Sequence, residues 1–236
     1  MMSLARKHFQ RVMAEKAAND ATSNAAETME GLTAYEQMLS QLQVHTAQLK
    51  SLQSREAKIA LKKEFAPLYD GYVDGILAGD SSAQDDVLIT QMIWRIDTGD
   101  YDRAYEIALH ALTYKLVLPE RFSRDLATYL AEDFAEAALQ AGTDADIHAP
   151  SARLLVAVAQ DLGEQDMPDE VRAKLHKAIA FRLQAEASPD TNAQALENAL
   201  EHVDRALKLD ARCGLKKHKE QLIRELKKQE EPPTTD

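Results

Sequence analysis

The residues in this sequence that are best suited to metal chemistry are aspartates around one apolar stretch. Carboxylates that converge on a divalent cation can activate water for phosphate-ester hydrolysis. The candidates are Asp85, Asp86, Asp97, Asp100 and Asp102. On one helix, Asp86 and Asp97 would lie about 16 Å apart, which is too far for a single ion. We therefore expect Asp85 to cap a helix and Asp97 to Asp102 to form a turn between helices, and we predict no metal site.

Other catalytic patterns are missing from the sequence. No two of the seven histidines have the i,i+4 spacing of a zincin helix. There is no glycine-rich phosphate loop, and no serine lies in a nucleophile elbow. The single cysteine, Cys213, excludes an internal disulfide and a zinc site with two thiolates. The sequence favours a protein with no catalytic residues and no cofactor.

Clusters of lysine and arginine are the stronger chemical signal. The net charge is −11, yet the chain has basic ends and an acidic middle. Basic clusters could bind an anion, and the alternative for each is a solvated helix face. One cluster near the start comprises Arg6, Lys7, His8, Arg11 and Lys16, and a second comprises Lys58, Lys62 and Lys63. A third basic segment, residues 205–230, includes Lys216, Lys217 and Lys219.

The elements that carry these clusters are predicted to be helices, which makes the fold all-α. Glycine and proline are scarce, at 8 and 7 residues, and no alternating strand pattern occurs. A short basic helix at 3–18 would be a mobile arm, because an Ala/Asn/Thr/Ser-rich stretch follows it. Later helices are expected at 68–77, 102–116, 123–141, 150–162, 168–187, 192–210 and 215–229. A further apolar helix through Ile96 follows a capping-box spacing formed by Ser82 and Asp85.

One long helix is predicted from Thr33 to about Phe65, with a capping-box spacing at its start. Its heptad pattern indicates a coiled coil through which the chain would self-associate. The residues assigned to oligomerisation are Tyr35, Met38, Leu42, Leu49, Leu52 and Ile59. The alternative is that this helix packs only against its own subunit.

Two later stretches have the small residues and spacing of half a tetratricopeptide repeat, at 99–112 and 199–210. Their separation fits no regular repeat, so an irregular stack of helical hairpins is expected. The predicted regions are a basic arm at 1–24, a long oligomerisation helix at 25–66, a central helical core at 67–145, a tetratricopeptide-like region at 146–229 and a disordered tail at 230–236. No stretch is apolar enough to cross a membrane, and Arg6, Lys7 and Arg11 interrupt any secretory signal.

Several runs of residues also resemble a known family. They are Ala34 to Leu39, Ala83 to Leu88 leading into Trp94 to Asp100, and Met167 to Lys177. A weaker match near the start comprises Ser3, Ala5, His8, Arg11, Val12 and Ala14. These runs resemble the terminase small subunit family of Peduovirus-type tailed phages, over most of residues 33–227. The chain departs from relatives with a basic tail, because it ends in acidic residues.

The resemblance implies a role in viral genome packaging. Small terminase subunits bind the packaging site on concatemeric DNA, assemble into rings or other homo-oligomers, and work with a large subunit that holds the ATPase and nuclease. For this chain it implies that the first and second basic clusters bind the cos region of double-stranded phage DNA. It further implies partnership with that large subunit and no membrane contact. It also implies the cytoplasm of the infected or lysogenic bacterium, and absence from the mature virion. Two alternatives remain, which are a tetratricopeptide-type adaptor without DNA binding and a metal-dependent endonuclease.

Overall fold

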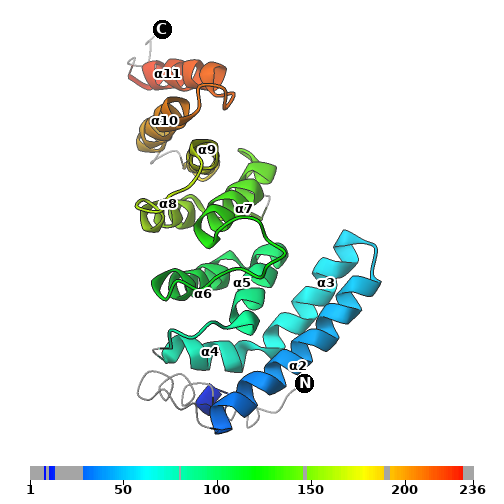
Figure 1. Ribbon diagram of the computed structural model, residues 1–236. Coiled ribbons are helices and arrows are strands. Elements are labelled where there is room, and N and C mark those ends of the chain that lie inside the picture. The colour runs from blue at the N-terminus through cyan, green and yellow to red at the C-terminus, as the bar shows by residue number, and fades with distance from the viewer. Residues whose placement is uncertain are drawn as a thin grey trace. The chain divides into compact units, whose positions relative to one another are not determined.

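The computed structural model describes residues 8, 11–13, 29–79, 81–145, 148–188 and 192–230. Within these residues the regular secondary structure is helical, which confirms the predicted all-α class (Figure 1). The chain divides into two compact units, Met1–Leu126 and Ala127–Asp236. The five regions predicted from the sequence stay a prediction.

Unit 1 is built around α5, an almost entirely buried helix. The helices of this unit are α2 (Met29–Ser51), α3 (Arg55–Phe65), α4 (Asp70–Ala78), α5 (Asp86–Thr98) and α6 (Tyr101–Thr113), with a 3-10 turn η1 (Ala66–Leu68) before α4. Every residue from Val87 to Trp94 of α5 is buried, as its apolar sequence predicts. Helices α2 and α3 run antiparallel as a hairpin, and both pack against α5 (Figure 1).

The hairpin corrects the prediction of one continuous helix from Thr33 to Phe65. Helix α2 ends at Ser51, and α3 begins at Arg55 after the Ser54 side chain accepts a hydrogen bond from the Ala57 amide. This is an ordinary serine N-cap, which satisfies one of the free amides at the start of α3. The chain therefore reverses direction where a rod was expected.

The turn from α5 to α6 follows local rules that the sequence had indicated. Asp85 caps α5 by accepting a hydrogen bond from the Leu88 amide at 2.8 Å. Gly99 ends the helix in the left-handed conformation, with φ of 83°, which glycine adopts without steric cost. The two helices then pack closely because Ala104, Ala108 and Ala111 of α6 are all buried.

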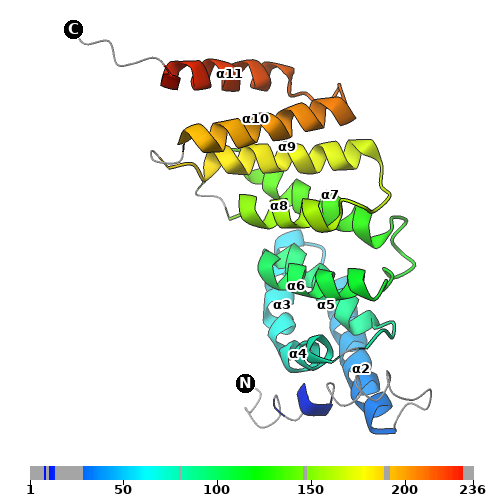
Figure 2. The same cartoon turned by 90° about the vertical axis from the view of Figure 1, so that its left-hand side faces the viewer.

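Unit 2 is a succession of helices in which neighbours in sequence pack together. The helices are α7 (Leu126–Ala141, whose first residue closes unit 1), α8 (Ala152–Asp161), α9 (Asp169–Ala185), α10 (Asn192–Leu209) and α11 (Lys216–Glu230). Helix α9 packs against α8 and α10, and α10 packs against α11 (Figure 2). The core shared by α9, α10 and α11 comprises Ala173, Ala180, Leu196, Ala199, Val203, Ala206, Leu215 and Leu222.

The small residues of this core explain why α9 and α10 approach closely. Ala173 and Ala180 on α9, and Ala199 and Ala206 on α10, are fully buried. Because alanine side chains are short, the backbones of α9 and α10 can approach closely, with the ridges of one helix packed into the grooves of the other. No helix among the described residues is long and apolar enough to cross a membrane.

Candidate nucleic-acid interface

The first predicted DNA-binding cluster falls mostly outside the described residues. Arg6, Lys7 and Lys16 lie there, so their assignment stays a prediction. His8 and Arg11 are described, and both are helical and exposed.

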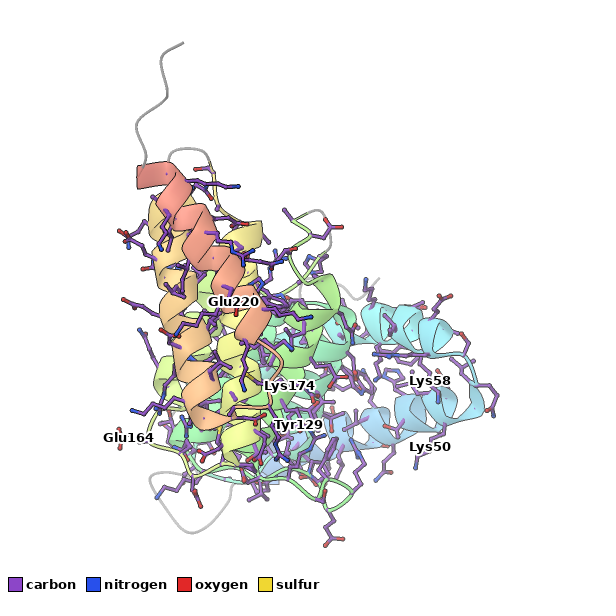
Figure 3. All side chains as sticks on the ribbon, turned by 90° about the horizontal axis from the view of Figure 1, so that it is seen from above. Lys50, Lys58, Tyr129, Glu164, Lys174 and Glu220 are labelled. Atoms are coloured by element: carbon purple, nitrogen blue, oxygen red, sulfur yellow. The ribbon has the colours of Figure 1, made fainter. Side chains whose placement is uncertain are left out.

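The second predicted cluster lies on α3, in the hairpin of unit 1. Lys58 and Lys62 are half-buried, and Lys63 is exposed. Two further cations, Lys50 at the end of α2 and Arg55 at the start of α3, are also exposed. We call Lys50, Arg55 and Lys58 the hairpin tip, because Lys50 lies in the last turn of α2 and the other two lie in the first turn or so of α3. Figure 3 labels Lys50 and Lys58 on the two helices.

The break between α2 and α3 creates this tip. In one continuous helix, Lys50 and Lys58 would be separated by about 12 Å along the axis. With the chain reversed at 52–54, the two residues lie on adjacent helices of the hairpin (Figure 3). Lys50 and Arg55 are not among the residues that the sequence predicts to bind DNA. The helix-capping serine at position 54 was the signal that could have located them.

Lys62 has a different role from the rest of its cluster. Its ammonium forms an ion pair with Asp97 of α5, and its side chain is 18% exposed. No ion pair holds Lys50, Arg55, Lys58 or Lys63 among the described residues. The cations available to an external anion are therefore those of the hairpin tip and Lys63.

Two acidic residues of α3, Glu56 and Glu64, lie near these cations in the sequence. Glu56 lies in the first turn of α3, where a carboxylate interacts favourably with the positive end of the helix dipole. Glu64 lies at the other end of the same helix and is exposed. The hairpin tip therefore has three cations, and Glu56, which follows Arg55 directly, is the one acidic residue between Lys50 and Lys58.

The aspartates that could have formed a nuclease centre are engaged separately. Tyr72 donates a hydrogen bond to Asp85 at 2.5 Å, and burial raises the pKa of the Asp85 carboxyl. Asp97 pairs with Lys62, and the Arg95 guanidinium contacts Asp100 at 2.5 Å. Asp86 accepts a hydrogen bond from Gln84, and Asp102 is exposed on α6. Among the described residues, no group of three or more His, Cys, Asp or Glu side chains is placed to hold a metal ion.

The predicted oligomerisation seam faces the interior of unit 1 instead of solvent. Met38, Leu42 and Leu49 are buried, with exposed fractions of 4%, 7% and 7%. Tyr35, Leu52 and Ile59 are half-buried. The apolar heptad positions of α2 are thus covered by the same chain, because α2 packs against α3 and α5. Self-association stays a prediction, but these buried side chains are not a free surface for it.

An aromatic cluster fixes the hairpin to the core. His45 of α2 stacks on Phe65 of α3 with ring centroids 3.8 Å apart. The His45 Nδ1 and the Tyr69 hydroxyl form a 2.8 Å hydrogen bond, and burial lowers the pKa of His45. Tyr69 and Phe65 both contact Trp94 of α5. The base of the hairpin is therefore held by ring packing, while its tip carries the cations.

Comparison with known proteins places this amino-acid sequence in a viral family. The model of the phage small terminase subunit family matches residues 39–170, more than half of the chain. The chain belongs to the phage small terminase subunit family. It is also 39% identical over 232 residues to the "Terminase, endonuclease subunit" of Escherichia phage P2, covering 98% of this chain and 89% of that protein. No solved structure matches the chain significantly.

The family match confirms the resemblance found in the sequence and supports a role in packaging phage DNA. The matched residues contain most of the hairpin, including its tip, and helices α4 to α8. Helices α10 and α11 lie beyond the family model, although the similarity to the P2 protein extends over nearly the whole chain.

Proposed function

We propose that this chain is the DNA-recognition subunit of a phage terminase, binding the cos packaging site and recruiting or regulating the large subunit. The observation that carries this proposal is the hairpin tip, where Lys50, Arg55 and Lys58 have no ion-pair partner among the described residues. Membership of the small terminase family supports the phosphates of duplex DNA as the ligand that we propose for these cations.

The net charge of −11 requires that binding be local. A small basic element can still hold DNA if several copies contact the same duplex, because linked contacts raise the effective concentration of each. We therefore include a homo-oligomer, in the form of a ring, in the proposal. Each protomer would add a hairpin tip and, at its start, a basic arm to a shared DNA path.

The proposal assigns DNA cutting to the large subunit. It is supported by the separate engagement of Asp85, Asp97 and Asp100 in caps and ion pairs. The printed name of the P2 relative contains the words endonuclease subunit, so intrinsic cutting is the competing activity. A direct assay must therefore measure binding and cutting together.

A tetratricopeptide-type adaptor is the second candidate, favoured by a groove in unit 2. The groove has a volume of about 700 Å³ and lies between α8, the end of α9 and α10. Its lining combines apolar Val156 and Leu183 with polar Arg153, Gln194 and Asn198. Such a lining suits a peptide segment, and this function needs no DNA.

The decisive experiment incubates the purified protein with a duplex containing the cos region and magnesium. A mobility shift without cutting supports the recognition subunit. Cutting by the protein alone would replace the proposal with an endonuclease, and neither shift nor cutting would favour the adaptor. The variant Lys50→Gln/Arg55→Gln/Lys58→Gln should lower affinity at least roughly tenfold and flatten the salt dependence.

A matched control separates the hairpin tip from net charge. Lys115, Arg121 and Arg153 are exposed cations on other parts of the chain. Replacing all three by Gln removes the same charge as the hairpin variant, and it should leave most of the affinity intact. An equal decrease in affinity for both variants would reject the tip as the binding element.

The N-terminal arm is tested by deleting residues 1–24. If the arm binds phosphates through Arg6, Lys7, Arg11 and Lys16, affinity and salt dependence should both decrease. Oligomer mass by light scattering should not change. If the truncated protein keeps the wild-type affinity and salt dependence, the hairpin tip remains the main proposed DNA-binding element.

A further inference from the structure

One side of α11, in unit 2, carries several exposed cations. We name it the α11 basic face, and it comprises Lys216, Lys217, Arg224, Lys227 and Lys228. All five side chains are exposed. The nucleic-acid interface described above lies in unit 1 and does not include them.

Helical geometry places these residues on one side. Lys217, Arg224 and Lys228 are spaced seven and four residues apart, so they lie on one stripe of the helix. The opposite side holds Leu222, which is buried in the core shared with α10, and the partly buried Leu226. Because α11 is the last helix of unit 2 and packs against α10, no other described helix of this unit lies on its far side (Figure 2).

Acidic groups neutralise only part of this face. Glu220, labelled in Figure 3, is the acid within the stripe. Its carboxylate lies 3.9 Å from the Arg224 guanidinium. Lys219, at the edge of the face, is used internally in a 2.5 Å ion pair with Asp204 of α10. No ion pair holds Lys216, Lys217, Lys227 or Lys228 among the described residues.

The chemistry of the face indicates an extended polyanion as its ligand. The large apolar side chains that are exposed in the described chain lie elsewhere, at Val12, Val44, Leu109 and Val117. A protein partner usually needs a buried apolar centre with a polar rim, and α11 offers no such centre on this side. Phosphates instead require cations at intervals along a line.

The dimensions fit a duplex. Lys217 and Lys228 are eleven residues apart, which is about 16 Å along the helix axis. This length corresponds to roughly five base pairs at about 3.4 Å per pair. Long lysine and arginine side chains can adjust to phosphates on either side of that line.

We infer that the α11 basic face is a second contact for double-stranded DNA, provided by unit 2 and separate from the hairpin tip. The inference rests on the proposed DNA-binding function and adds a surface to it. The contact is to the phosphate backbone, so it contributes affinity for any duplex and not sequence recognition. An acidic protein segment is the rival ligand.

The test uses the full-length protein and a fluorescent duplex of mixed sequence, roughly 30 base pairs long. The variant Lys217→Gln/Arg224→Gln/Lys228→Gln removes three exposed cations without placing a poor helix former in α11. Anisotropy titrations between about 50 and 200 mM salt should show that affinity decreases roughly tenfold or more. The slope of log affinity against log salt should become shallower by about 0.9 for each phosphate that the variant no longer neutralises.

A second variant should change DNA affinity in the opposite direction. Glu220→Gln removes the acid from the stripe and should raise affinity by a factor of about two to five, because it removes repulsion between a carboxylate and phosphate. This result remains informative if the triple variant loses helicity. The control is Lys115→Gln/Arg121→Gln/Arg153→Gln, which should retain most of the wild-type affinity.

The outcomes separate this inference from the proposed function. If the hairpin variant loses cos binding while the α11 triple variant keeps wild-type affinity and salt slope, the α11 contact is rejected and DNA recognition stands. The same titrations with fluorescent poly-glutamate test the rival ligand. If the α11 triple variant loses poly-glutamate binding and keeps duplex binding, the face is assigned to an acidic protein instead. A wild-type protein that binds neither duplex overturns both proposals together.

Discussion

Lys62 of α3 forms an ion pair with Asp97 of α5 and so joins the hairpin to the central helix of unit 1. One helical turn earlier, Lys58 has no ion-pair partner among the described residues. Two lysines from the same predicted cluster therefore have different surroundings, and their substitutions should differ in effect.

The first prediction contrasts these two lysines. Lys62→Gln should lower the free energy of unfolding by about 0.2–1 kcal/mol and leave DNA affinity unchanged, because its ammonium is already paired. Lys58→Gln should leave stability unchanged and reduce the salt slope by about 1 if it binds one phosphate. Urea unfolding and anisotropy titrations measure the two effects. Reversed results would place the DNA contact at the base of the hairpin.

The second prediction concerns the buried pair of Tyr72 and Asp85. Tyr72→Phe should destabilise the protein by about 1–3 kcal/mol, since a buried carboxylate oxygen loses its donor. Asp85→Ala should also destabilise it, because α5 loses its N-cap. Asp85→Asn keeps an acceptor at that position and should be the milder change. Thermal unfolding monitored by circular dichroism ranks the variants, and equal melting temperatures for Asp85→Ala and the wild type would contradict the capping role.

The third prediction is a pH dependence that originates in unit 2. The Nδ1 atoms of His176 and His202 lie 2.8 Å apart, so one ring donates and the other accepts. Burial and the neighbouring His202 lower the pKa of His176 to about 4, and burial lowers the pKa of His202. Both values lie below the ordinary value of 6.5, so the unfolded chain binds more protons between about pH 4 and 6.5. The free energy of unfolding should therefore fall as pH falls through this window.

The size of that pH effect has an upper bound. One proton taken up only by the unfolded state changes the free energy of unfolding by at most about 1.4 kcal/mol per pH unit. His202→Asn removes one titrating group and its repulsion of His176, so the pH slope should become smaller. Urea titrations at about pH 7, 6 and 5 measure it. An unchanged slope in the variant would show that other groups dominate acid destabilisation.

The fourth prediction tests whether the heptad positions of α2 are buried within one chain or form an interface between chains. Leu49→Asp puts a charge into the interior of unit 1, so it should cause loss of helicity and not a folded monomer. Leu49→Ala should destabilise the protein by about 2–5 kcal/mol and leave oligomer mass unchanged. Circular dichroism and light scattering distinguish the two cases. A well-folded Leu49→Asp variant with reduced mass would restore the seam as an oligomer interface.

The helices that the sequence located well have a strong local signal at one end or at both. Gly99, Asp100 and the preceding apolar run define the end of α5 and the start of α6 within a few residues of the expected positions. The predicted helix at 168–187 is observed as Asp169–Ala185. Caps and glycine turns act within about four residues of chain, so a single sequence contains what determines them.

The break at 52–54 was missed because it uses neither glycine nor proline. Ser54 begins α3 by capping, but the heptad pattern continues through it with Leu52 and Ile59. A heptad pattern predicts that the apolar side chains are buried, but it does not identify the helix that covers them. Here the partner is α5 of the same chain, and choosing it over a second copy depends on residues tens of positions away.

The contacts of the candidate sites show the same limit. Lys62 meets Asp97 across 35 residues, and His176 meets His202 across 26. Single-helix spacing in the sequence cannot reveal a histidine pair formed between α9 and α10. By contrast, the basic character of α11 was visible in the sequence, because the spacing of its cations follows from one helix.

Packing between sequence neighbours in unit 2 has a consequence for how the protein folds. Helices α9, α10 and α11 each pack against the preceding helix, so their contacts join residues close in the chain. Local contacts require little loop closure before they form, and such topologies fold quickly. We expect this unit to acquire structure progressively as each helix leaves the ribosome.

Unit 1 should behave differently during synthesis. The hairpin of α2 and α3 completes its burial only when α5 is available, because both helices pack against it. Until residue 98 has emerged, Met38, Leu42 and Leu49 have no core to enter. The nascent hairpin is thus the stage at which this chain exposes apolar surface, and there aggregation or chaperone binding would compete with folding.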